Sequence, residues 1–248
     1  MPHPDELVAD LRAYWDEDAA GYDQAPGHQP RRPAVLAAWR ALLADVLPPA
    51  PARVLDAGAG TGFVSLLAAE LGHQVTALDL SPGMLARLRQ KAEARSLSIE
   101  AVVQPAHAPP PGPFDAVVER HLLWTLPDPR RALAAWRQVA PHGRLVLLES
   151  LWGHADPDRS WRQPLLQLWR RLRAVPPDHH APYPAALRAA LPLGTGTPPD
   201  QLVALAEEAG WRRPRLRRLA DVEWVENADR HPLDRLLDSS RRFCLLAD

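Results

Sequence analysis

Cysteine is nearly absent from this chain of 248 residues, in which Cys244 is the only one. A single cysteine excludes a framework of internal disulfides and argues against a metal site with cysteine ligands. Long apolar runs are also lacking, because no segment approaches the roughly 18 residues that a membrane-spanning helix needs. The first residues, MPHPDE, lack the positive stretch and the apolar run that are typical of a secretory signal. We therefore expect a cytosolic location.

Lysine is as scarce as cysteine, since Lys91 is the only one. Arginine supplies the rest of the positive charge, and the formal net charge of the chain is -1. The chain has no basic run typical of nucleic-acid binders, and we interpret the arginine clusters at 170–173 and 212–218 as solvated surfaces. We expect neither a nucleic acid nor a membrane as partner. Hydrophobic residues make up 46% of the chain, which is enough for the core of one α/β domain with an insertion.

A glycine-rich stretch, VLDAGAGTG, joins an apolar strand predicted over 53–55 to a helix predicted over 63–71. Such a turn presents backbone N–H groups and the positive end of a helix to a ligand, and glycine is needed there because a Cβ would block a close approach. A dinucleotide site needs a small residue where this chain has Phe63. Asp56, directly before the turn, would repel a pyrophosphate. The stretch therefore favours a ligand with a positive charge or an amino group over a nicotinamide cofactor.

A second motif follows the next strand, predicted over 74–78. Asp79 ends this strand about 20 residues beyond the glycines, where an acidic side chain can accept hydrogen bonds from both ribose hydroxyls of a nucleoside. Ser81 is predicted to cap a helix that Pro82 opens. Leu80 and Met84 are placed to contact the faces of an adenine ring. The two motifs together therefore predict a nucleoside site.

The two motifs resemble those of the class I S-adenosylmethionine-dependent methyltransferases, D/E-x-G-x-G-x-G and D-x-S-x-x-M-L, and the resemblance covers 50–150 firmly. It implies a doubly wound, mostly parallel seven-stranded α/β sheet with an antiparallel last strand, N-terminal helices and a helical insertion after the fifth strand. We expect a single domain over 1–248, with an N-terminal helical lid at 1–48 and a substrate-covering insertion at 151–199. The implied cofactor is S-adenosylmethionine, with S-adenosylhomocysteine as the product.

The same resemblance implies which residues hold the cofactor. The first helix, predicted over 5–23, carries the family pattern Y-(W/F)-x-x-x-A-x-x-Y-D, which favours a role for its tyrosines in covering the cofactor; packing against the main domain is the alternative. The family usually has an acidic residue after the third strand, but this chain has QPAH at 104–107. Backbone groups of Ala106 or the side chain of His107 are expected to take its place. The implied cofactor-binding residues are Tyr14, Tyr22, Asp56, Gly58, Ala59, Gly60, Gly62, Asp79, Leu80, Met84, Ala106, His107 and Arg120.

The loop RHLLWTLPDP at 120–129 is similar to the signature R-H-x-L-W-x-L-x-x-P of small-molecule methyltransferases, and it follows a predicted strand end, where ligands bind in doubly wound sheets. His121 is the candidate catalytic residue, because a neutral histidine can accept the proton of a hydroxyl. A hydrogen-bonded scaffold histidine is the alternative. Histidines in the insertion lack a carboxylate or cysteine at ligand spacing, so we expect no metal. The candidate substrate contacts are Trp124, Trp152, His179 and Tyr183.

The sequence thus predicts an enzyme that transfers a methyl group by in-line displacement to a nitrogen or oxygen atom of a small molecule, and a secondary metabolite is expected. Two alternatives stay open: methylation of a peptide or protein, and a non-catalytic protein that binds S-adenosylmethionine. A groove would indicate the first, and a filled acceptor cavity the second. We expect a monomer or a homodimer.

Overall fold

Seven strands form one sheet in the order β3-β2-β1-β4-β5-β7-β6. The computed structural model describes residues 4–24, 27–173, 183–238 and 241–248. Strands β1 to β5 pair in parallel, whereas β7 is antiparallel to both β5 and β6. The predicted fold class is therefore confirmed. The strands are β1 (Arg53–Ala57), β2 (Gln74–Asp79), β3 (Ile99–Val103), β4 (Ala116–Arg120), β5 (Arg144–Ser150), β6 (Arg215–Arg218) and β7 (Arg242–Ala247).

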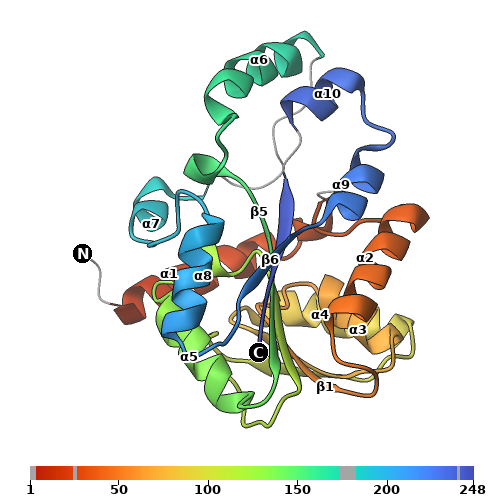
Figure 1. Cartoon of the computed structure of the whole chain (residues 1–248), viewed down its shortest axis with the longest axis vertical. Helices are drawn as coiled ribbons and strands as arrows, with labels where there is room; N and C mark the ends of the chain where they lie inside the picture. The colour runs from red at the N-terminus through yellow and green to blue at the C-terminus, as the bar shows by residue number, and fades with distance from the viewer. Residues whose placement is uncertain (1–3, 25–26, 174–182, 239–240) are drawn as a thin grey trace.

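Helices cover both faces of this sheet (Figure 1). One face packs on α2 (Pro33–Val46), α3 (Phe63–Glu70) and α9 (Ala220–Asn227). The other face packs on α5 (Pro129–Val139) and α8 (Pro199–Glu208). Leucine, valine and alanine dominate both layers, and the central strands are buried on both sides, as expected for a parallel sheet.

Two helices begin in the same way: the side chain of the residue before the helix caps its first turn. Helix α4 (Pro82–Ala94) starts after Ser81, whose hydroxyl oxygen accepts a hydrogen bond from the backbone N–H of Met84 at 3.0 Å. Helix α5 starts after Asp128, whose carboxylate accepts from the N–H of Arg131 at 2.9 Å. Both helices have proline in the first turn, where the missing N–H costs nothing. The predicted cap at Ser81 is confirmed.

The N-terminal segment differs from the single helix predicted over 5–23. Helix α1 (Pro4–Asp18) ends early, and a separate 3₁₀ turn, η1 (Tyr22–Gln24), follows. The carboxylate of Asp23 accepts hydrogen bonds from the Thr61 hydroxyl at 2.5 Å and from Lys91 Nζ at 2.9 Å. These bonds tie η1 to the glycine turn and to α4. The segment is therefore held by partners far along the chain, which a helical pattern does not reveal.

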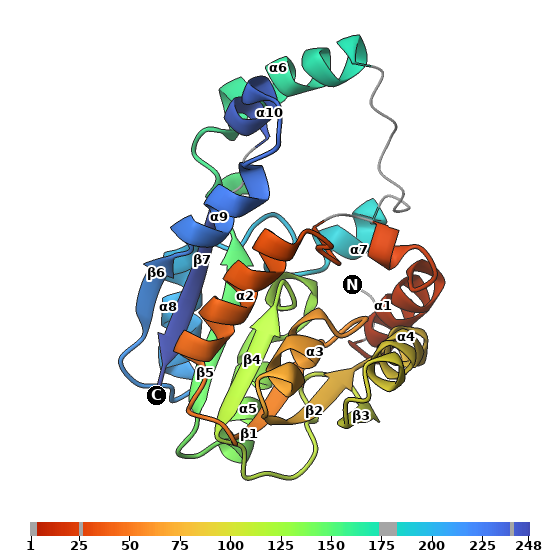
Figure 2. The same ribbon diagram turned by 90° about the vertical axis from the view of Figure 1, so that its right-hand side faces the viewer.

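The insertion after β5 divides into two parts. Its first part contains η3 (Gly153–Ala155) and α6 (Arg159–Leu172), and α6 lies beside α10 (Pro232–Leu237), beyond the end of the main body (Figures 1 and 2). Its second part contains α7 (Ala185–Ala189), which packs on α1 through Leu187 and Leu191. A 3₁₀ turn, η2 (Leu123–Thr125), follows β4. Among the described helices, none is both long and apolar enough to cross a bilayer.

Candidate functional site

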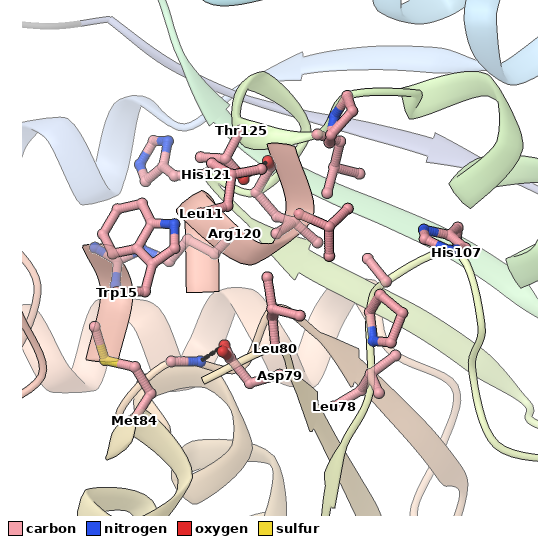
Figure 3. A pocket seen from close by; sticks show the side chains of 18 of the residues that line it. Leu11, Trp15, Leu78, Asp79, Leu80, Met84, His107, Arg120, His121 and Thr125 are labelled. Carbon is pink, nitrogen blue, oxygen red and sulfur yellow. Dashed lines mark hydrogen bonds between the residues drawn. The ribbon is translucent and has the colours of Figure 1, made fainter. Parts of the chain in front are cut away.

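A pocket opens at the carboxyl ends of β1, β2 and β4, and α1 and η1 cover it (Figure 3). Ligands bind at this end of doubly wound sheets. In Figure 3, Trp15 and Met84 lie on the opposite side of the pocket from His107. The lining residues are Val8, Leu11, Trp15, Tyr22, Gly58, Gly60, Leu78, Asp79, Leu80, Met84, Pro105, Ala106, His107, Arg120, His121, Leu122, Thr125, Leu126 and Pro127.

The glycine turn forms one wall of this pocket. Gly60 has a φ of 55°, and a Cβ placed on it would extend into open space, with the ring of Tyr22 nearest at 3.9 Å. Gly58 has a φ of 68°, and a Cβ on it would meet the Leu122 side chain at 2.6 Å. Both positions lie in the left-handed region that favours glycine. The turn therefore leaves bare backbone beside a space that a ligand can fill.

Asp79 stands next to the turn, and backbone hydrogen bonds fix its carboxylate. One oxygen accepts from the N–H of Gly60 at 2.7 Å and the other from the N–H of Ser81 at 2.8 Å. Each carboxylate oxygen can accept a further bond, so two neighbouring hydroxyls can still be received. Burial raises the pKa of Asp79 to about 6, against backbone hydrogen bonds that lower it. The arrangement fits the predicted contact with a ribose.

Beyond Asp79, largely apolar residues line the pocket on two sides (Figure 3). Leu80 and Met84 come from the end of β2 and the start of α4, and Ala106 and His107 come from the loop after β3. The carbonyl oxygen of Ala106 accepts a hydrogen bond from the indole N–H of Trp136 at 2.8 Å. One of the backbone groups predicted to replace the missing carboxylate is thus already engaged inside the protein. Apolar faces remain available for a flat ring.

Acidic side chains hold the cover over the pocket. On α1, Asp16 accepts from the Ser81 hydroxyl at 2.5 Å and from the Gly83 N–H at 3.0 Å. Tyr22 lies inside, where burial raises its pKa to about 12. Its ring stacks on His28 with the centroids 4.0 Å apart. The cover is thus fixed at both α1 and η1.

Arg120, at the end of β4, contacts the segment of the chain that follows η1. Its guanidinium donates to the carbonyl oxygens of Gly27 and His28. The group lies over the rings of Phe63 and Trp39, 4.5 Å and 4.9 Å from their centroids. Burial lowers the pKa of Arg120 to about 10. Its Nε atom is buried and has no hydrogen-bond partner within the part of the chain that the structure describes.

His121 lines the pocket as predicted, and both of its ring nitrogens are engaged. Nδ1 lies 3.2 Å from a carboxylate oxygen of Glu149, and Nε2 lies 3.1 Å from a guanidinium nitrogen of Arg242. Because arginine only donates, Nε2 accepts and Nδ1 carries the proton that it donates to Glu149. Burial, with Arg120 and Arg242 nearby, holds the pKa of His121 well below its ordinary value. The imidazole is therefore neutral and fixed in one tautomer.

Three buried carboxyl groups lie behind the pocket wall at the ends of the central strands, and sequence reasoning missed two of them. Asp56 accepts from the Ser65 hydroxyl, and Glu119 accepts from the N–H of Leu122 at 2.8 Å. Burial raises the pKa of Asp56 to about 7. The pKa values of Glu119 and Glu149 are also raised, by burial and by neighbouring carboxyl groups. Glu119 and Glu149 interrupt otherwise apolar strands, and this interruption is the signal that could have identified them. The pattern alone assigns them no function.

Several predicted site residues do not line the pocket. Asp56 is only 2% exposed, and Ala59 packs with Leu85 and Leu88 of α4. Gly62 donates its N–H to the carbonyl oxygen of Ala59 at 2.9 Å, and a Cβ on Gly62 would meet Leu88 rather than the pocket. Asp56 and Gly62 therefore shape the turn without facing the pocket. His179 lies outside the described residues.

The remaining predicted residues form an aromatic cluster beside the pocket. The ring of Tyr183 lies 4.6 Å from Tyr14, 5.2 Å from Trp124 and 6.0 Å from Trp15, measured between centroids. Trp124 lies 5.3 Å from Trp152. Trp15 joins this cluster to the pocket lining. Tyr14, Trp124, Trp152 and Tyr183 are therefore brought together, although they pack on one another and not on the pocket itself.

Sequence reasoning also missed some of the lining residues. Leu122, Thr125, Leu126 and Pro127 belong to the loop that it singled out, and their places within the loop signature could have identified them. Over the described residues, no group of three or more histidine, cysteine, aspartate or glutamate side chains could hold a metal ion. The pocket is therefore lined by polar and apolar residues, with His107 from the loop after β3 and His121 from the loop after β4.

Comparison with known proteins identifies this part of the chain. Residues 55–147 match the model of a family described as methyltransferase domain. The demethylmenaquinone methyltransferase of Thermus thermophilus is 41% identical over 117 residues, which are 45% of this chain and 53% of that protein. The ubiquinone biosynthesis O-methyltransferase of Xanthomonas campestris is 34% identical over 152 residues, or 59% of each chain. The tRNA 5-carboxymethoxyuridine methyltransferase of Escherichia coli is 37% identical over 106 residues, 40% of this chain and 41% of that protein.

The chain thus spans roughly two fifths to three fifths of the relatives that it matches. A solved structure of geranyl diphosphate methyltransferase in complex with GPP and sinefungin aligns with a TM-score of 0.61 at 14% identity, covering 98% of this chain and 99% of that one. At this identity the likeness shows the fold alone. The matched residues include the glycine turn, Asp79 and the loop that carries His121. Residues 55–147 therefore match a methyltransferase domain, which agrees with the resemblance to the S-adenosylmethionine-dependent methyltransferases and with S-adenosylmethionine as the cofactor.

Proposed function

We propose that the chain transfers a methyl group from S-adenosylmethionine to a nitrogen or oxygen atom of an apolar small molecule, such as a secondary metabolite. The observation that carries the proposal is one pocket that has the glycine turn and Asp79 at one end and an apolar wall with His121 at the other. The bound cofactor supplies a methyl group that its sulfonium already activates. The protein has to hold the acceptor in line and exclude water, which can contribute about 7–11 kcal/mol.

The cofactor-binding end has named roles in this proposal. Asp79 accepts hydrogen bonds from the ribose hydroxyls, and the bare backbone at Gly58 and Gly60 receives the amino-acid end. Leu80 and Met84 contact the adenine ring. The buried Nε of Arg120 and the covering ring of Tyr22 complete the enclosure.

At the acceptor end, Leu11, Trp15, Leu122 and Leu126 give an apolar surface that favours a flat, poorly hydrated acceptor. His121 is the proposed proton acceptor for a hydroxyl. Its Nε2 must then exchange the hydrogen bond from Arg242 for one from the acceptor. If that exchange does not occur, His121 is a fixed scaffold for the loop, and an amine that is already unprotonated is the better acceptor.

The proposed lid over 1–48 and the proposed insertion over 151–199 contribute unequally. Asp16 and Asp23 hold α1 and η1 over the pocket, which supports the lid. Among the described residues of the insertion, the part around α7 reaches α1, through Leu187 and Leu191. We propose that this second part, with Tyr183 beside it, forms the substrate cover.

The test is incubation of the protein with S-adenosylmethionine and separate acceptors: hydroxylated quinols, aromatic amines, a peptide mixture and tRNA. Formation of S-adenosylhomocysteine and the mass of the product are measured for each. The proposal expects turnover with apolar small molecules only. Turnover with tRNA or peptide alone would contradict the acceptor class. Binding of S-adenosylhomocysteine with no turnover on any acceptor would indicate a non-catalytic binding protein.

A further inference from the structure

Helix α6 carries a stripe of exposed apolar side chains, which we call the α6 stripe and define as Trp161, Leu165, Leu168 and Leu172. Their exposed fractions are 48%, 49%, 56% and 73%. The spacing of four, three and four residues places all four side chains on one face of the helix. Large apolar residues scattered singly on a surface are ordinary, but an aligned set on one helix indicates an interaction site.

A neighbouring face of α6 is the one that the fold uses. The indole N–H of Trp169 donates to Asp234 on α10 at 2.8 Å, and the Trp169 ring lies 5.0 Å from the ring of His231. Arg173 also pairs with Asp234, at 2.8 Å, and Arg170 pairs with Asp238 at 3.1 Å. These contacts set the rotation of α6 about its axis. The α6 stripe is consequently left exposed beside this contact.

The position of the helix supports an outer partner. In both views α6 and α10 stand at the extreme end of the molecule, away from β1, with α9 between α10 and the sheet (Figures 1 and 2). We call residues 153–173 and 228–238 the arm. A flat, extended partner can therefore approach the arm without meeting the main body.

The charge of the arm discriminates between partners. It contains seven arginines and five aspartates, a net charge of +2, whereas the whole chain has -1 and the remainder therefore has -3. Within 159–173 five arginines occur and no acidic residue. A second copy of the chain would bring an arm of like charge against this one. A surface with negative charge above an apolar interior matches both the arginines and the stripe.

We propose that the arm docks on an anionic lipid bilayer, with α6 lying in the plane of the surface and the α6 stripe inserted among the upper acyl chains. Helices of this kind combine tryptophan and leucine on one face with arginine around them. The 14 residues of α6 are too few to span a bilayer, so the contact is peripheral. This partner departs from the expectation from the sequence that no membrane is involved, and it does not depend on the proposed methyl transfer.

The test is co-sedimentation of the full chain with vesicles of phosphatidylcholine mixed with phosphatidylglycerol, and with vesicles of phosphatidylcholine alone. We expect binding to the mixed vesicles that weakens with added salt. Leu165→Glu and Leu168→Glu should each lower the partition coefficient about tenfold or more. Each replaces a leucine that would be buried in the bilayer by a negative charge that the anionic lipids repel. Leu216→Glu is the matched control, since Leu216 is 47% exposed on β6 outside the arm and its replacement should not change binding.

Each of three results would overturn the proposal. One is the absence of sedimentation with either vesicle while the chain is folded, as judged by circular dichroism and by binding of S-adenosylhomocysteine. Another is a dimer in light scattering that Leu168→Glu dissociates, because the α6 stripe would then be the contact between two copies. An equal loss of lipid binding in Leu216→Glu would also count against it.

Discussion

The Nε2 atom of His121 accepts a hydrogen bond from Arg242 at 3.1 Å, across 121 positions of the sequence. Arg242 begins β7, and its Nε donates to Glu226 at 2.6 Å. The histidine in the pocket is thus coupled to the antiparallel edge of the sheet. Its φ of 58° lies in the left-handed region, so the loop backbone is itself held in an uncommon conformation.

Arg242→Gln should raise the pKa of His121, because it removes one of the positive charges that lower it. Burial is the largest cause and remains, so the pKa should move only part of the way toward 6.5. The measurement is an NMR titration of the imidazole carbons. Arg217→Gln is the control, since Arg217 pairs with Asp45 on the surface. An unchanged pKa in Arg242→Gln would show that the two side chains do not interact in solution.

His121→Ala should lower turnover with a hydroxyl acceptor by about 10²–10⁴-fold if His121 accepts the proton. Binding of S-adenosylhomocysteine should change little, because the histidine lies at the acceptor end. Turnover is followed by product formation and affinity by calorimetry. A collapse of cofactor affinity would assign His121 to the cofactor site instead. Unchanged turnover would leave it as a scaffold residue.

Asp79→Ala should weaken binding of S-adenosylhomocysteine by about 1.5–3 kcal/mol, the usual contribution of a hydrogen bond to a charged group. Asp79 also holds the N–H groups of Gly60 and Ser81, so Asp79→Asn is a second variant that keeps part of that geometry. Calorimetry measures the affinity, and Asp45→Asn on the exposed surface serves as control. Equal affinity in all three variants and the native chain would refute the ribose contact.

The ionisation of Asp56 should lower the free energy of unfolding as the pH rises from about 4 to about 7. Its pKa is raised from 3.8 to about 7 in the folded chain, so within this window the folded state holds a proton that the unfolded state releases. Asp56→Asn should therefore raise the stability at pH 8 by on the order of 1–3 kcal/mol and have little effect at pH 4.

Thermal unfolding at both pH values checks this, with Asp45→Asn as the exposed control. The amide of Asn can still accept from the Ser65 hydroxyl, so the hydrogen bond is preserved. A loss of stability at pH 8 in Asp56→Asn would show that the charged carboxylate, and not its neutral form, is the one that the fold favours.

Local signals in the sequence were sufficient for most of the fold. The glycine turn, the proline and serine at the start of α4 and the apolar strands each act over a few residues, and each predicted its element. Helix α9 was not predicted, because its apolar residues are fixed by packing on α2. The early end of α1 likewise depends on Asp23 and its distant partners.

The site was predictable only in part. Gly60, Asp79 and His121 follow strand ends, so their convergence results from the parallel sheet. The partners that decide what His121 can do, Glu149 and Arg242, lie on strands whose pairing no short motif encodes. Residues were therefore easier to place near the ligand than to assign a protonation state.

The scarcity of lysine has a practical consequence for watching the cover move. Lys91 is the only lysine, and its Nζ holds Asp23 of η1 and the side chain of Gln29. An isotope-labelled methyl tag added by reductive alkylation would report from this one side chain and from the amino terminus. A chemical shift that responds to S-adenosylhomocysteine would show that ligand binding changes the contact between Lys91 and η1, without any engineered label.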